Sequence, residues 1–253
     1  MSGAGNDFAV VDIRGTAPEL SALAKRLCQL TGADGFLAVD ESEIADFRLH
    51  FYNSDGSRGE MCGNGARCVC KFAYDRGIAG KSMTVQTDAG LVRAWHLSGE
   101  KYRVQLNNPG VFDPRRKENC AYVELGEPGI PHVVTRLPEL TWDMAQSLRG
   151  MGQALRCDPA FPKGANVNFY TLLAPGRVRI LTYERGVEDY TLACGTGSAS
   201  VAVTLWLGGQ LPGGKLEAEN QGGKLTVTVE GTQNKVEALY LEGPAQTLKT
   251  LNL

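Results

Sequence analysis

The stretch Ala193-Cys194-Gly195-Thr196-Gly197-Ser198-Ala199-Ser200 has a counterpart earlier in the chain, Met61-Cys62-Gly63-Asn64-Gly65-Ala66-Arg67-Cys68. Aligned on the first cysteine of each, both read Cys-Gly-polar-Gly-small, and both lead into an apolar stretch with helical spacing. The two cysteines lie 132 residues apart (194 minus 62), about half of the 253-residue chain. One copy of the motif in each half predicts two similar halves, each presenting one thiol.

The residues of each motif predict where its cysteine lies. Glycines on either side of Asn64 and of Thr196 permit unusual backbone angles and allow a ligand close to the main chain. The apolar spacing predicts helices over residues 66–74 and 198–207. Each cysteine then sits at a helix N-terminus, where unpaired N–H groups and the helix dipole favour an anion and lower the pKa of a thiol.

Two such helix ends could surround one carboxylate with amides and place a thiol on each side of it. One proton carrier per face of a carbon is the requirement for inverting a stereocentre, because one thiolate removes the α-proton and the other thiol delivers a proton to the opposite face. For either motif alone a small core cysteine in a turn is the better interpretation. The pair in opposite halves favours the catalytic one.

The two cysteine motifs do not match the known dinucleotide- and phosphate-binding motifs. Neither stretch is a full G-x-G-x-x-G after a strand with an acidic residue about 20 positions on, and G-x-x-x-x-G-K-[ST] does not occur.

The composition argues against polyanionic partners and membranes. The net charge is −2 with a pI near 6.0, which gives no reason to expect binding to nucleic acid or an anionic membrane. No apolar run approaches the ~18 residues that span a bilayer. The first residues lack the basic and then apolar pattern of a signal peptide, so we expect a cytoplasmic protein.

The cysteines do not predict a disulfide framework or a metal centre. Their number is odd, seven, in a long chain without a secretion signal. There is no C-x-x-C pair, and His50, His96 and His132 are scattered. We therefore expect no metal.

The pattern of elements predicts an α+β fold. Many short strands and one long helix in each half fit two pseudo-symmetric domains, each a mixed or antiparallel sheet wrapped around a central helix. The stretch 107–119, rich in Pro, Asn and charge, is the best linker. We expect one domain over residues 1–112 and another over 113–245, with a last strand at about 246–253 that can join the first. Further elements are expected as helices at 18–30 and 141–148 and strands at 8–11, 36–39, 46–52, 83–86, 91–95, 102–106, 121–125, 132–136, 166–172, 178–183, 216–218, 225–229, 236–241 and 247–251.

Several stretches together resemble the diaminopimelate epimerases. They are G-A-G-N-D-F at 3–8, F-Y-N-S-D-G-S at 51–57, C-G-N-G-A-R-C at 62–68, P-H at 131–132, N-V-N-F at 166–169 and Y-E-R-G…A-C-G-T-G at 183–197. They follow the family's order over almost the whole chain. The two cysteine motifs together with E-R-G are the specific part.

This resemblance implies a cofactor-independent, two-thiol epimerase that interconverts LL- and meso-diaminopimelate for lysine and cell-wall synthesis. It implies a site in the cleft between two pseudo-symmetric domains, and it suggests a homodimer. By family role Cys62 and Cys194 are the acid/base pair, with Cys62 the base in the LL direction. The other roles it implies are these: the reacting carboxylate is held by Gly63, Asn64, Gly195 and Thr196; the reacting amino group lies near Asn6 and Glu184; the distal amino-acid end is held by Asn53, Asn166 and Arg185; the thiols are tuned by His132 and Glu184.

Each of these residues also has a simpler interpretation. Asn53 reads as a turn residue, His132 as a structural histidine, and Glu184 with Arg185 as a solvated charge pair of little energetic value. Arg185 can equally fork onto a substrate carboxylate.

One departure from the family pattern leaves the substrate open. The family commonly has Asn-Pro-His where this chain has Ile130-Pro131-His132, so one polar contact to the distal end is missing. A racemase of another amino acid, such as histidine, on the same fold is therefore an alternative. A catalytically silent binding protein is a second alternative, although a mere binder has no use for the second thiol.

Overall fold

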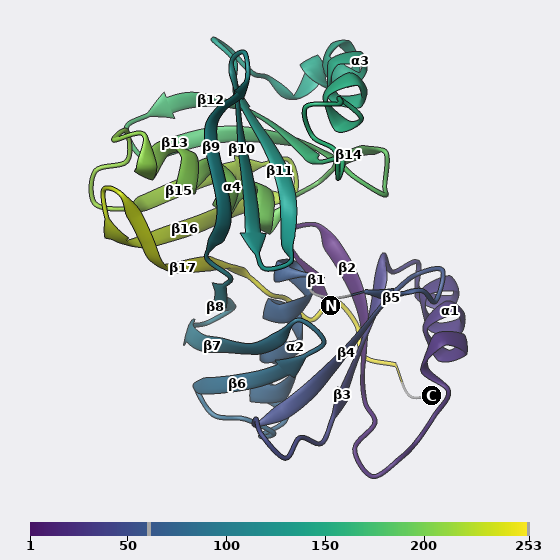
Figure 1. The fold of residues 1–253 in the computed structure, drawn as a ribbon. Helices are drawn as coiled ribbons and strands as arrows, with labels where there is room; N and C mark the ends of the chain where they lie inside the picture. Colours follow the sequence, from purple (N-terminus) through teal and green to yellow (C-terminus); the bar gives the residue numbers. More distant parts are fainter. Residues whose placement is uncertain (60–61, 252–253) are drawn as a thin grey trace. The chain divides into compact units, whose positions relative to one another are not determined.

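The computed structural model describes residues 1–59 and 62–251, which form two compact units (Figure 1). The first unit comprises Met1–Gln105 and Glu242–Leu253, and the second comprises Leu106–Leu241. The chain therefore leaves the first unit once and returns to it near the C-terminus.

The first unit is a mixed sheet with two helices. The elements are β1 (Ser2–Gly3), β2 (Asn6–Asp12), α1 (Leu20–Thr31), β3 (Gly35–Asp40), β4 (Phe47–Asn53), β5 (Arg58–Gly59), α2 (Gly63–Asp75), β6 (Ser82–Thr87), β7 (Gly90–Ser98) and β8 (Lys101–Leu106). Strand β2 pairs antiparallel with β1 and parallel with β3. Strand β4 pairs antiparallel with β3 and β5 and parallel with β6, and β7 pairs antiparallel with both β6 and β8.

The two helices of this unit differ in burial. Helix α1 is amphipathic and packs Ala24, Leu27 and Cys28 against the sheet, beside Phe36 of β3. Helix α2 is buried along most of its length and packs on β1, β2, β3 and β7. A helix that is enclosed in this way must be apolar or internally satisfied, which makes its polar residues informative.

The second unit repeats the plan. The elements are β9 (Pro109–Lys117), β10 (Cys120–Gly126), β11 (Gly129–Arg136), the 3-10 turn η1 (Trp142–Met144), α3 (Ala145–Arg156), β12 (Asn166–Ala174), β13 (Arg177–Glu184), β14 (Asp189–Thr191), α4 (Gly195–Leu207), β15 (Lys215–Asn220), β16 (Gly223–Thr232) and β17 (Lys235–Pro244). Strand β10 pairs antiparallel with β9 and β11, and β12 pairs parallel with β11 and antiparallel with β13. Strand β13 pairs antiparallel with β14 and parallel with β15, and β16 pairs antiparallel with β15.

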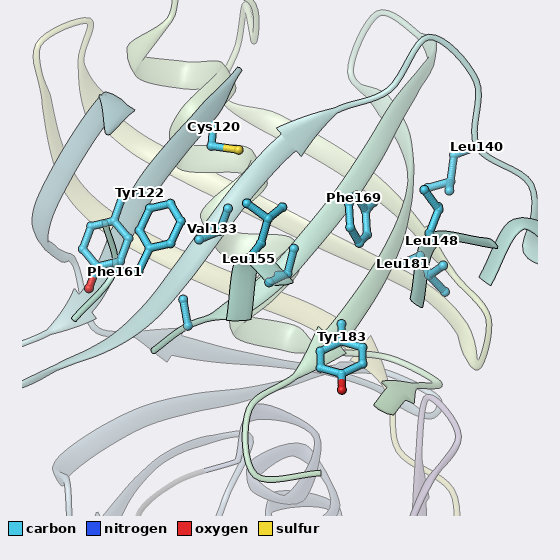
Figure 2. Packing of buried hydrophobic residues seen from close by; sticks show 12 residues of the cluster. Cys120, Tyr122, Val133, Leu140, Leu148, Leu155, Phe161, Phe169, Leu181 and Tyr183 are labelled. Carbon is cyan, nitrogen blue, oxygen red and sulfur yellow. The ribbon is translucent and has the colours of Figure 1, made fainter. Parts of the chain in front are cut away.

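One apolar core cluster of the second unit lies between its sheet and α3. Figure 2 shows its apolar side chains, among them Phe169 and Leu181 from the sheet and Leu155 from α3. Tyr122 and Phe161 stack with ring centroids 5.6 Å apart. Helix α4 packs on β9, β10, β11, β12, β15 and β16, so it holds the same place in this unit as α2 in the first. The predicted α+β class, with a sheet around a central helix in each unit, is confirmed.

Two expectations about the elements are wrong, and one helix is longer than expected. Residues 109–117 form strand β9 and pair with β10, so the stretch 107–119 is not a linker. Residues 247–251 contain no strand; Ser2 and Gln246 form an isolated bridge, and residues 252–253 lie outside the described part of the chain. The helix expected at 141–148 begins as η1 and continues as α3 to Arg156.

Candidate active site

Both motif cysteines precede a helix, as the sequence predicts. Cys62 has an extended backbone (φ −126°, ψ 120°) and α2 begins at Gly63. Cys194 has nearly the same angles (φ −111°, ψ 112°) and α4 begins at Gly195. The first N–H groups of an α-helix have no partner within the helix, so each thiol lies where a negative charge is stabilised.

Helix α2 begins against the β1–β2 hairpin of the first unit. Gly3 pairs with Asn6, and a Cβ at Gly3 would come within 2.8 Å of the Asn64 carbonyl oxygen. The hairpin backbone therefore lies directly on the first turn of α2. Asn6 is therefore one pairing position away from this turn, and its role toward a substrate stays a prediction.

A buried guanidinium lies on the same turn. Arg67 is fully buried and donates to the Gly63 carbonyl (3.1 Å) and to Oδ1 of Asn64 (2.8 Å). Its Nε lies 3.4 Å from the Pro244 carbonyl, and no salt bridge joins it to a carboxylate among residues 1–59 and 62–251. Burial lowers the pKa of Arg67, and the same enclosure raises the pKa of the Cys68 thiol to about 12. Cys68 is thus inert at neutral pH, unlike a thiol at a helix end.

Asn53 lies at the end of β4 and is exposed. Its N–H donates to the Ser57 carbonyl and its Nδ2 donates to the Ser57 hydroxyl, both at 2.9 Å. The turn interpretation of Asn53 is therefore correct for the structure as it stands, and any role toward a ligand stays a prediction.

In the second unit the thiol of Cys194 is held by its own helix. The Gly197 N–H donates to Sγ (3.3 Å), and the Thr196 hydroxyl lies 3.5 Å from it. Cys194 is 8% exposed. A side chain at Gly197 would collide with Oδ1 of Asn168, so only glycine allows α4 to start this close to β12.

His132 is completely buried on β11 and has one side-chain partner. Its Nδ1 lies 3.2 Å from Nδ2 of Asn168, while Nε2 has no hydrogen-bond partner among residues 1–59 and 62–251. Asn168 also donates to the Val133 carbonyl (2.9 Å) and accepts from the Thr182 hydroxyl (3.0 Å). Burial, with a smaller contribution from the Arg185 charge, lowers the pKa of His132 to about 3.

Asn166 connects two other expected site residues. It lies opposite His132 in the parallel β11–β12 ladder, and its Oδ1 accepts from the Arg185 N–H (2.8 Å). The Arg185 guanidinium donates to the Lys163 carbonyl (2.8 Å). The neighbouring Glu184 accepts from the Thr191 hydroxyl (3.0 Å), and burial raises the pKa of its carboxyl.

The expected residues are divided into two groups, one in each unit. In the first unit Cys62, Gly63 and Asn64 lie at the start of α2, Asn6 begins β2 and Asn53 ends β4. The group of the second unit lies at the start of α4, on strands β11 to β13 and just after β13, and its members are His132, Asn166, Glu184, Arg185, Cys194, Gly195 and Thr196.

Sequence reasoning missed the polar residues that support these groups. Asn168 and Thr182 are fully or almost fully buried beside His132, and Arg67 is buried in α2. Asn166 and Asn168 are two residues apart in a strand, so their side chains lie on one face, and that spacing was a usable signal. In the described part of the chain, no group of three or more His, Cys, Asp or Glu side chains is arranged to hold a metal ion, and no helix has the length and apolarity to cross a bilayer.

Comparison with known proteins identifies the family. The family model described as diaminopimelate epimerase matches residues 1–110 and 127–248. The chain is 35% identical over 258 residues to the diaminopimelate epimerase of Chlorobaculum tepidum, covering 98% of this chain and 97% of the relative. This chain belongs to the diaminopimelate epimerase family.

Another relative has the same family name, and two solved structures share the fold. The Aquifex aeolicus diaminopimelate epimerase is 35% identical over 228 residues, covering 83% of this chain and 81% of that protein. A PhzF-family protein of Bacillus anthracis superposes with a TM-score of 0.75 at 16% identity, covering 96% of this chain and 92% of that one. A probable proline racemase of Agrobacterium radiobacter gives 0.66 at 17% identity, with coverages of 99% and 91%. At these identities the two structures support the fold alone.

Proposed function

We propose that this protein is a cofactor-independent epimerase that interconverts LL- and meso-2,6-diaminopimelate and thereby serves lysine and peptidoglycan precursor synthesis. The observation that carries the proposal is the cysteine at the N-terminus of the central helix in both units. Membership of the diaminopimelate epimerase family supplies the substrate.

In the proposed reaction each unit contributes one acid/base thiol. Cys62 as a thiolate removes the α-proton of the LL isomer, and the Cys194 thiol protonates the opposite face. The helix N-terminus behind each sulfur stabilises its thiolate, which lets a thiol act as a base near neutral pH. In the reverse direction the two thiols exchange roles.

The carboxylate at the reacting carbon is proposed to bind main-chain N–H groups at Gly63, Asn64, Gly195 and Thr196. A carboxylate there accepts from the first N–H groups of the two helices, and the negative charge that develops on deprotonation of the α-carbon is stabilised by the same donors.

The remaining residues are proposed to orient the two amino-acid ends. Asn6 and Glu184 contact the reacting amino group, while Asn53, Asn166 and Arg185 hold the distal end. Arg185 suits that role because a guanidinium pairs with a carboxylate in a fork, and Asn166 already fixes the Arg185 backbone. His132 and Glu184 are proposed to tune the thiols.

The test is isotope exchange. Purified protein incubated with LL-diaminopimelate in D₂O, without pyridoxal phosphate, should give meso product with deuterium at the inverted carbon. The absence of both deuterium exchange and epimerisation would refute the proposal. Removal of either acid/base partner should lower kcat by at least about 100-fold.

Matched cysteine variants locate the chemistry. Cys62→Ser and Cys194→Ser should each lose epimerisation, whereas Cys157→Ser should keep it because Cys157 is exposed, follows α3 and belongs to neither motif. Equal activity in all three variants would exclude a two-thiol reaction. A catalytically silent binding protein would likewise keep its ligand affinity and biological role in both Cys62→Ser and Cys194→Ser.

A substrate panel addresses the alternative amino acids. Ile130 is the one feature that favours a different substrate, such as histidine, and none of the comparisons supports that alternative. Turnover of diaminopimelate in preference to histidine is the expected result. We further propose that the protein acts in the cytoplasm as a homodimer; sedimentation equilibrium at twice the 27.2 kDa chain mass would support the dimer.

A further inference from the structure

The ring nitrogen Nε2 of His132 is a buried polar atom. Nε2 is enclosed and has no hydrogen-bond partner in the part of the chain that the structure describes, although His132 is 0% exposed. Buried polar groups are nearly always paired, so an orphan of this kind needs an explanation in function. What Nε2 can do depends on whether it carries a proton.

The orientation of Asn168 decides that question. The Asn168 amide lies between a carbonyl oxygen, that of Val133, and a hydroxyl, that of Thr182. A carbonyl only accepts, so the group that faces Val133 at 2.9 Å must be the NH₂ of Asn168. Oδ1 then faces Thr182, which donates to it.

The same NH₂ faces Nδ1 of His132 at 3.2 Å, closer than the Asn166 carbonyl at 3.5 Å. An NH₂ group can only donate, so Nδ1 must be the unprotonated, accepting nitrogen. A neutral imidazole carries one proton, and that proton is therefore on Nε2. The surroundings of the ring also favour its neutral form, since burial and the cation of Arg185 both lower the pKa of His132.

We propose that Asn168 is a positioning residue that holds His132 as the neutral Nε2–H tautomer and so presents a buried hydrogen-bond donor to an anionic acceptor in the reaction. The ring then acts by donating a hydrogen bond and does not take up a proton. Its connection to the chemistry runs through Gly197, whose lack of a side chain lets Asn168 lie against the first turn of α4, next to Cys194. The part that concerns the reaction rests on the proposed epimerase function, whereas the tautomer does not.

The tautomer can be measured directly. The chain has three histidines, so long-range ¹H–¹⁵N spectra of protein labelled with ¹⁵N-histidine are simple, and His132→Gln assigns the signals of His132. We expect Nε2 to resonate as a protonated nitrogen and Nδ1 as an unprotonated one, unchanged from about pH 5.5 to pH 8.5. A protonated Nδ1 in the wild-type protein, or titration in that range, overturns the proposal without any variant.

Asn168→Asp reverses the bond that sets the tautomer. A carboxylate can only accept, so Nδ1 should become protonated in this variant. Asn220→Asp is the matched control, because Asn220 is a buried amide of the same unit that donates to Ala218 and Ser198 instead. It should leave the His132 spectrum unchanged. An unchanged spectrum in Asn168→Asp, or the same change in the control, overturns the assignment.

Kinetics test the positioning role. With the tautomer reversed, kcat for diaminopimelate should fall at least about tenfold, with a smaller change in KM. A reversed tautomer with wild-type kcat overturns the positioning role. If the wild-type protein does not turn over diaminopimelate, the proposed function fails, and the spectra still decide the tautomer.

Discussion

Gly197 is the residue at which the second cysteine motif leaves least room. A Cβ there would overlap Oδ1 of Asn168 and come within 3.1 Å of the Thr182 hydroxyl and 3.2 Å of the Cys194 Cβ. These neighbours are buried and hydrogen-bonded, so they cannot move without losing their own bonds.

We therefore predict that Gly197→Ala lowers the free energy of unfolding by about 1–3 kcal/mol. Gly150→Ala is the control, since Gly150 lies in α3 with no neighbouring atom within 4 Å of a new Cβ. That change should raise stability by up to about 1 kcal/mol, because alanine is the better helix former. Urea denaturation measures both. Equal effects of the two substitutions would show that α4 does not begin where the structure has it.

His132 makes the free energy of unfolding depend on pH, and the sign of this dependence follows from its pKa. Its pKa is lowered to about 3 in the folded protein, mainly by burial, against about 6.5 in an unfolded chain. Between these values the unfolded chain binds one more proton, so this residue's stability contribution is present above about pH 6.5 and is lost as the pH falls toward 3.

His132→Gln should therefore flatten the fall of unfolding free energy below pH 6.5, by a slope of at most about 1.4 kcal/mol per pH unit. The comparison is urea denaturation of both proteins between about pH 4 and pH 7. His50→Gln is the control, because His50 is only partly buried beside Asp40. Parallel curves for wild type and His132→Gln would mean that His132 titrates normally in the folded state.

At the scale of elements, one carboxylate of β17 bonds two cations of β8. Glu242 is nearly buried, and it bonds Nε of Arg103 at 2.8 Å and lies 3.1 Å from the Lys101 ammonium. Burial alone would raise the pKa of Glu242, but the hydrogen bonds and charges of these two cations outweigh burial and hold it below its usual range. The ion pairs of Glu242 with these two cations stabilise the fold only while its carboxylate is ionised.

Glu242→Gln should destabilise the protein by about 1–3 kcal/mol at pH 7. A lowered carboxyl pKa gives stability above the unfolded value of about 4.3, and that stability is lost as the pH falls through the folded pKa. The difference between wild type and variant should therefore shrink below about pH 4 in denaturant titrations. Glu217→Gln, which removes an exposed carboxylate 3.7 Å from Arg177, should change stability by less than about 1 kcal/mol at every pH. A loss in Glu242→Gln that does not change with pH would contradict the ion-pair explanation.

At the scale of the whole molecule, the proposed reaction needs one thiol from each unit at a single carbon. If both thiols reach that carbon, a mild oxidant can join them in a disulfide when no substrate lies between them. We predict that oxidation abolishes activity, that a dithiol restores it, and that peptide mapping finds Cys62 linked to Cys194. Cys157→Ser should behave like the wild type, since its thiol is outside the motifs. Inactivation that a dithiol does not reverse, with no such peptide, would count against the two-thiol geometry.

Much of the fold was predictable because its signals are local. The helices after both cysteine motifs and most strands follow from apolar periodicity, and structure extends them by only a few residues. Strand β9 was missed because its Pro, Asn and charged residues favour a loop, and pairing with β10 overrides that preference. The 247–251 stretch failed in the opposite way, since its alternation finds no partner strand in the described chain.

The sequence by itself determined that two cysteines would each begin a helix, because glycine positions and helical spacing act within a dozen residues. Only the tertiary structure decided which polar groups support them. His132, Asn168 and Thr182 lie on three strands, up to 50 residues apart, and meet because β12 pairs parallel with β11 and antiparallel with β13. Strand register is set by packing of the whole sheet, so no local pattern could have placed the Asn168 amide against the His132 ring.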